Sequence, residues 1–106
     1  MKEPSSFLSS LNKTEMSDDE LNVYVNLLAN VKSKNEQINA VEHLLRVIEL
    51  TPNQIIGLLE NEPVKNSIAL KYPIKKYVSI RHYKEAEQKS ENESLWMTAL
   101  LHMGSI

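Results

Sequence analysis

The sequence predicts an all-α protein, a small helical domain of about five helices. Only two glycines, Gly57 and Gly104, occur in 106 residues, too few for the turns that connect the strands of a β fold. Apolar residues recur every three or four positions in several segments, which is the period of an α-helix. Two of these segments begin with a capping box. A chain of this length forms one domain with a modest core, so oligomerisation would help to stabilise it.

Residues 1–16 are expected to form a flexible N-terminal arm. The segment is rich in Ser, Lys and Glu, contains Pro4, and offers only Phe7, Leu8 and Leu11 for packing. This composition is typical of a loose terminus. The segment also lacks the apolar run and the small-residue cleavage site of a signal peptide.

The first helix is predicted over residues 18–32. The Ser17 side chain can accept a hydrogen bond from the Glu20 amide while the Glu20 side chain returns to the Ser17 amide, which makes a capping box. Three consecutive acids at 18–20 also favour the positive end of a helix dipole. One face carries the apolar residues Leu21, Tyr24, Leu28 and Val31, and Val25 and Leu27 widen it.

The second helix is expected to follow Asn35, which can cap it. Its apolar face is again wide and consists of Ile38, Val41, Leu44, Leu45, Val47 and Ile48. Apolar faces of this width are typical of a buried core, and they also suit self-association or a stable partner.

The third helix begins with the clearest local signal in the chain. Thr51 is placed to cap it, Pro52 suits the first helical position because its φ is fixed, and Gln54 completes a capping box. Pro63 disfavours helical geometry at the residue before it, so this helix is expected to end near Asn61.

Residues 64–72 are compatible with either a strand or a helix. Ile68, Leu70 and Tyr72 alternate as in a strand, but the segment would equally form a short helix that ends before Pro73. Helical spacing returns after that proline. A last helix is predicted from position 94 to Gly104, which is placed to end it.

Charge divides the predicted domain, residues 17–106, into two halves. Up to position 62 the chain contains ten acids and five bases, a net charge of −5, and beyond it seven bases and four acids, a net charge of +3. From Pro63 to Lys84 there are six bases and no acid. We expect residues 17–62 to form an acidic dimerisation and core half, and residues 63–106 a basic contact half.

The basic stretch predicts contacts with nucleic acid. Tyr72, Tyr77 and Tyr83 fall among its bases, and hydroxyl groups beside long cationic side chains suit phosphates and sugars. A solvated lysine-rich face is an equally common outcome of such a composition. The residues expected to contact DNA are Lys71, Lys75, Lys76, Arg81 and Lys84.

Catalysis, cofactors and metal sites are not predicted. The chain has no cysteine, which excludes disulfides, thiolate metal sites and thiol nucleophiles. It also lacks a Gly-rich phosphate loop, paired metal-binding histidines and a nucleophile elbow. Its apolar runs are too short to cross a membrane, so we expect a cytoplasmic protein.

Three segments follow one another in the order ELNVYVNLLA at 20–29, IEL at 48–50 and LTPNQIIGLLEN at 50–61. In this order they resemble the FlhD family. FlhD is the helical subunit of the bacterial flagellar master activator, and similar subunits of the SetD and AcaD type occur in conjugative elements. The resemblance implies a helix-exchanged or intertwined homodimer made by the N-terminal helices. It also implies a zinc-bearing FlhC-like partner, binding to double-stranded promoter DNA and recruitment of RNA polymerase.

By this resemblance, five apolar residues are dimer or core positions: Leu21, Tyr24, Leu28, Val41 and Leu45. The alternative hypothesis is a small helical adaptor, such as an immunity protein, an anti-activator or a secretion chaperone. Its basic stretch would bind an acidic protein instead of DNA.

Overall fold

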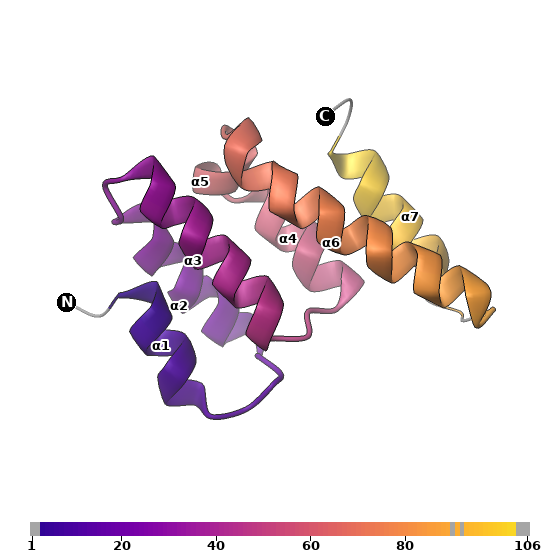
Figure 1. Ribbon diagram of the computed structural model, residues 1–106, viewed down its shortest axis with the longest axis horizontal. Helices are drawn as coiled ribbons and strands as arrows, with labels where there is room; N and C mark the ends of the chain where they lie inside the picture. The colour runs from indigo at the N-terminus through magenta and orange to yellow at the C-terminus, as the bar shows by residue number, and fades with distance from the viewer. Residues whose placement is uncertain (1–2, 90, 92, 104–106) are drawn as a thin grey trace.

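The computed structural model describes residues 3–89, 91 and 93–103, and the regular structure of that part is entirely helical. The helices are α1 (Pro4–Leu11), α2 (Asp18–Ala29), α3 (Lys34–Val47), α4 (Pro52–Glu60), α5 (Glu62–Lys65), α6 (Ile68–Glu87) and α7 (Glu93–His102) (Figure 1). The all-α prediction is confirmed, although the described residues form seven helices instead of about five. The additional ones are α1 and the short α5. The expected stop at Gly104 lies outside the described residues.

The helices form two packed layers. Helices α3 and α6 lie side by side at the front of Figure 1, and α1 packs against α3. Helix α2 lies behind α1 and α3, while α4 and α5 lie behind α6. Helix α7 packs against both α6 and α4. The domain measures 43 × 31 × 19 Å, with α1 and α2 toward one end of its long axis and α7 toward the other.

All five predicted dimer or core residues lie in the core of this one chain. Leu21, Tyr24, Leu28 and Val41 are buried, and Leu45 is half-buried against them. The Tyr24 hydroxyl donates a hydrogen bond to the Ala40 carbonyl oxygen at 2.6 Å, which joins α2 to α3. These five residues therefore take part in the core of a single chain, while Val47 of the same predicted apolar face of α3 is exposed.

Helix α1 is packed on the domain where a flexible arm was expected. Pro4 occupies its first turn, where the missing amide donor has no intrahelical partner to lose. Leu8 and Met16 are buried in the core, and Phe7 and Leu11 pack against it. The contacts that stabilise α1 come from α2 and α3, not from its own short sequence, so the composition of residues 1–16 alone did not predict this helix.

Both predicted capping boxes are confirmed. Ser17 Oγ accepts from the Glu20 amide at 3.1 Å, and Glu20 Oε1 accepts from the Ser17 amide at 2.8 Å. Thr51 and Gln54 make the same reciprocal pair at 3.1 and 3.0 Å. Hydrogen bonds from the Lys13 ammonium and the Ser17 amide lower the pKa of the Glu20 carboxyl.

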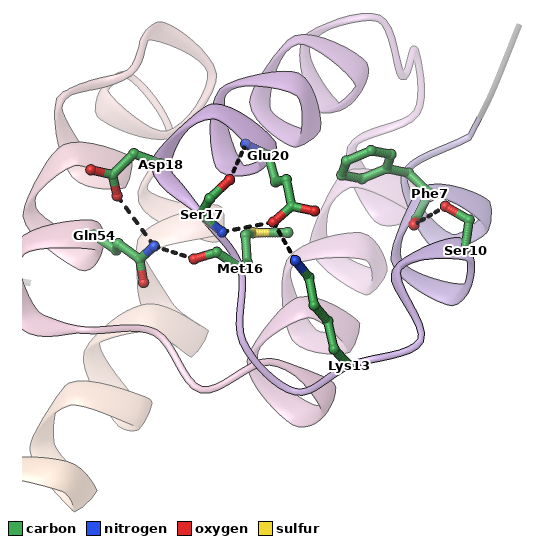
Figure 2. A network of polar contacts seen from close by, with 8 residues as sticks. All are labelled: Phe7, Ser10, Lys13, Met16, Ser17, Asp18, Glu20 and Gln54. Atoms are coloured by element: carbon green, nitrogen blue, oxygen red, sulfur yellow. Dashed lines mark hydrogen bonds and ion pairs between the residues drawn. The ribbon is translucent and has the colours of Figure 1, made fainter.

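The side chain of Gln54 joins the start of α4 to the start of α2 (Figure 2). Its Nε2 donates to the Met16 carbonyl oxygen at 2.6 Å and to Asp18 Oδ1 at 3.3 Å. Because Gln54 is buried, these bonds replace the water that its amide loses on folding. The same residue therefore caps one helix and positions another.

Ser33, and not Asn35, caps α3. The Ser33 Oγ accepts a hydrogen bond from the Glu36 amide at 3.4 Å, and Asn35 lies in the first turn. Serine and asparagine cap helices about equally well, so the local sequence did not show which of the two residues caps α3.

Helix α6 resolves the ambiguity of residues 64–72. It begins after Ser67, whose Oγ accepts from the Leu70 amide and from Lys34 Nζ, both at 3.3 Å. It then continues through Pro73 to Glu87. A proline inside a helix removes one hydrogen bond, and packing of α6 against α3 and α7 offsets that loss.

Candidate nucleic-acid interface

One side of α6 is exposed along the length of the helix. A helix turns by about 100° per residue, and the buried residues Leu70, Ile74 and Val78 mark the inner side of α6. The large side chains that remain exposed are Ile68, Tyr72, Ile80 and Tyr83. Together with the exposed Lys76, we call these residues the outer face of α6. No acid occurs in the helix before Glu85.

The five bases predicted to contact DNA do not share one side of α6. Lys76 is exposed in the middle of the outer face, and Lys84 is exposed at one edge of it. Lys71 and Lys75 lie one turn apart at the other edge and are half-buried. Arg81 lies on the inner side of the helix. The structure therefore groups the four lysines around the outer face and separates Arg81 from them.

Arg81 takes part in the packing of α6 against α7. Its guanidinium carbon lies 5.3 Å from the centre of the Trp96 ring system and 5.9 Å from that of Tyr77. Its Nη2 also lies 3.9 Å from Glu85 Oε1. The rings of Tyr77 and Trp96 meet edge to face, with centroids 6.1 Å apart. Arg81 thus forms the centre of a cation–π cluster.

The three tyrosines of the basic stretch also separate. Tyr77 is half-buried, and its hydroxyl oxygen accepts a hydrogen bond from the Leu50 amide at 3.3 Å. Tyr72 and Tyr83 are exposed on the outer face. They are eleven residues apart, which corresponds to about 16.5 Å along the axis and a rotation of only about 20°.

The exposed aliphatic residues of the outer face were not singled out from the sequence. Ile68 and Ile80 looked like core residues of a strand or of a helix face, yet both are exposed. A single helical wheel drawn through Pro73 would have placed Ile68 on the side opposite Leu70 and Ile74. The proline concealed that signal because it is expected to end a helix.

Helix α7 carries apolar residues on both sides. Trp96 and Ala99 are buried against the domain, while Leu95, Met97 and Leu101 are exposed. The exposed side also carries the polar residues Ser94, Thr98 and His102, so it is mixed in character, and its apolar residues suit a further contact. The part of the chain that the structure describes covers only one side of α7.

The contact between α6 and α7 includes two buried nitrogens without a hydrogen-bond partner among the described residues, His82 Nε2 and Trp96 Nε1. The nearest acid to His82 Nε2 is Glu93, whose Oε1 lies 4.0 Å away, beyond hydrogen-bond distance. Packing and the Arg81 cluster therefore hold this contact together.

A surface hollow of about 570 Å³ lies away from α6, between α1, α2 and α3, and its ionisable lining residues are Glu3, Lys32 and Glu36. No group of three or more His, Asp or Glu residues in the described ranges is arranged to hold a metal ion. None of the described helices combines the length and apolarity needed to cross a bilayer.

Comparison of the chain with protein-family models, with curated proteins and with solved structures gave no match. The likeness to FlhD therefore stays a prediction from the segments at 20–29 and 50–61, which form α2 and the capped α4. What the geometry defines is a helical domain with a basic, partly aromatic outer face on α6 and exposed apolar residues on α7.

Proposed function

We propose that this chain is a subunit of a transcriptional activator and contacts promoter DNA through the outer face of α6. The supporting observation is the exposure of Lys76 and Lys84 on a helix that carries no acid before Glu85. Lysines at such a surface neutralise phosphates and release counterions, which gives affinity that does not depend on base sequence. Four lysines supply only weak binding, so a second DNA-binding subunit is part of the proposal.

The remaining parts of the proposal follow from the resemblance to FlhD. The second subunit is an FlhC-like protein that carries the zinc site, and the complex recruits RNA polymerase in the cytoplasm. The chain itself has no catalytic role and needs no cofactor. It acts as a homodimer. Most apolar residues of α2 and α3 are covered within one chain, with Val23 and Val47 exposed, so the exposed apolar residues of α7 are the proposed assembly surface.

The DNA contact is tested by charge reversal on the outer face. In the complex with the partner subunit, Lys76→Glu should weaken promoter binding and reduce the slope of log affinity against log salt by roughly 0.9 per lost phosphate contact. Lys32→Glu is the matched control, because Lys32 is also exposed but lies between α2 and α3. Equal affinity and slope for wild type and Lys76→Glu would remove Lys76 from the DNA interface.

A second candidate function is an adaptor that binds an acidic protein. The exposed Ile68 and Ile80 favour it, because apolar side chains exposed beside polar ones are typical of sites that contact other proteins. Affinity purification with and without nuclease separates the two functions. Recovery of a cysteine-rich zinc protein together with nuclease-sensitive DNA supports the activator, whereas an acidic protein recovered equally after nuclease treatment supports the adaptor.

A further inference from the structure

We infer that the outer face of α6 binds single-stranded nucleic acid in preference to a duplex, by stacking unpaired bases on Tyr72 and Tyr83. This inference rests on the proposed function and specifies the form of nucleic acid that α6 contacts. It follows from the exposure of the two rings, from their spacing and from the charges around them.

The two rings are available to a ligand. Tyr72 is 62% and Tyr83 65% exposed, and no hydrogen bond or ring contact joins either one to another residue in the described part of the chain. Exposed aromatic rings stack on nucleobases whatever the base, since every base has a π face. A duplex hides these faces within its own stack and presents only base edges and phosphates.

The spacing suits a short run of nucleotides. The two residues are eleven positions apart on the same side of α6, which is about 16.5 Å along the helix axis and equals about five nucleotides at the 3.4 Å rise that each strand has in B-DNA. Single-stranded sites on other proteins span about 4–16 nucleotides. Ile68 and Ile80 add apolar surface beside the rings.

The charges complement a strand that follows the helix. Lys76 lies between the two tyrosines along the chain and is exposed, and Lys84 is exposed beyond them. Lys71 lies at the opposite edge, so cations flank both sides of the stacking surface. The absence of Asp and Glu between Pro63 and Lys84 leaves nothing in this stretch to repel a phosphate backbone.

The test compares affinities of the full chain for a labelled single-stranded oligothymidylate and for a mixed-sequence duplex of the same length, by fluorescence anisotropy at one salt concentration. Wild type should bind the single strand more tightly. The double variant Tyr72→Ala/Tyr83→Ala should lose on the order of five- to a hundred-fold per ring on the single strand and change little on the duplex. The matched variant Tyr72→Phe/Tyr83→Phe keeps both rings and should bind like wild type.

The outcomes separate this inference from the proposed function. Duplex binding that equals or exceeds single-strand binding, with no effect of the alanine variant but a clear loss in Lys76→Glu, would overturn the stacking inference and leave DNA binding by α6 in place. Binding to neither probe would overturn the stacking inference, whereas the DNA contact of α6 is decided separately by Lys76→Glu in the complex with the partner subunit. Circular dichroism of the variants checks the fold, which should not change because both side chains are exposed.

Discussion

Arg81 belongs to the basic stretch in sequence but to the contact between α6 and α7 in space. It follows the buried Ile74 by seven residues, or about two turns, so it lies on the core side of the helix. Its planar guanidinium packs beside the rings of Tyr77 and Trp96. Counting charges along the chain grouped it with the lysines, because such a count does not register the side of a helix that each residue occupies.

Replacing Arg81 should destabilise the protein. Arg81→Ala removes the cation–π contacts and the packing of the side-chain stem, with an expected loss of about 1–2 kcal/mol in the free energy of unfolding. Urea denaturation followed by the fluorescence of Trp96, the only tryptophan, measures this loss. Arg81→Lys keeps the charge without the planar group, so its free energy of unfolding should lie between those of wild type and Arg81→Ala. Wild-type stability of the alanine variant would contradict a structural role for Arg81.

Tyr24 carries a buried hydroxyl whose removal should also destabilise the protein. Tyr24→Phe removes the hydrogen bond that the hydroxyl donates to the Ala40 carbonyl oxygen at 2.6 Å, and the loss of one such bond costs about 0.5–1.5 kcal/mol. Thermal or urea unfolding of the purified variant tests this expectation. A variant as stable as wild type would show that water replaces the phenol.

The same residue predicts a dependence of stability on alkaline pH. Burial raises the pKa of the Tyr24 phenol above its ordinary value of 10.0. Because the folded-state pKa is the higher one, the stabilisation is fully present below pH 10.0 and is lost as the pH rises beyond it. The free energy of unfolding of wild type should therefore fall more steeply above about pH 10 than that of Tyr24→Phe. Parallel curves for the two proteins would contradict this assignment.

The two helix starts that have a capping box were predictable from the sequence, whereas the extent of two helices was not. The capping boxes at Ser17 and Thr51 involve residues three positions apart, so a short window contains all the information. Helix α1 and the continuation of α6 through Pro73 depend on packing against helices elsewhere in the chain. No local pattern contains those contacts.

The candidate site was predicted in composition but not in arrangement. The sequence placed Tyr72 and Lys76 in the same basic stretch. However, if residues 64–72 had formed a strand, nothing would have determined whether the side chains of Tyr72 and Tyr83 lie on the same side of the domain. The continuous α6 fixes both on one side. The same continuity turns Tyr77 and Arg81 toward the core, which charge and composition alone could not distinguish.

The proline inside α6 predicts a gain in stability on substitution. Pro73→Ala restores a donor for the Ala69 carbonyl, and an interior proline costs about 3 kcal/mol relative to alanine. Alanine also makes the unfolded chain more flexible than proline does, which lowers the free energy of unfolding by about 0.4–1 kcal/mol. Since α6 is already adapted to the ring, we expect a net gain of about 1–2 kcal/mol in the free energy of unfolding, measured from urea midpoints.

Gly57→Ala in α4 provides a comparison for that experiment. An added Cβ at Gly57 would meet nothing within 4 Å, so only backbone propensity changes, with an expected gain of about 0.5–1 kcal/mol. If Pro73→Ala lowers stability while Gly57→Ala raises it, the proline ring itself is needed where α6 packs.

Assembly of the whole molecule is tested on α7. Leu101 is 74% exposed, so Leu101→Glu should leave the core intact while it introduces a charge into an apolar surface. If two copies associate through α7, sedimentation velocity should show a dimer for wild type and a monomer for Leu101→Glu. Lys32→Glu should behave like wild type. A dimer that persists in Leu101→Glu would place the contact elsewhere, as in a helix-exchanged arrangement.

The positive charge of the chain lies between two acidic segments. Residues 1–62 carry −5, residues 63–84 carry +6, and residues 85–106, with four acids and one base, carry −3. The basic segment includes most of α6, while α1 and α2 lie toward one end of a domain 43 Å long and α7 toward the other. Charges screen one another over about 8 Å at physiological salt, so an approaching polyanion is attracted by α6 and repelled by the acidic segments separately. Productive collisions would therefore begin with α6.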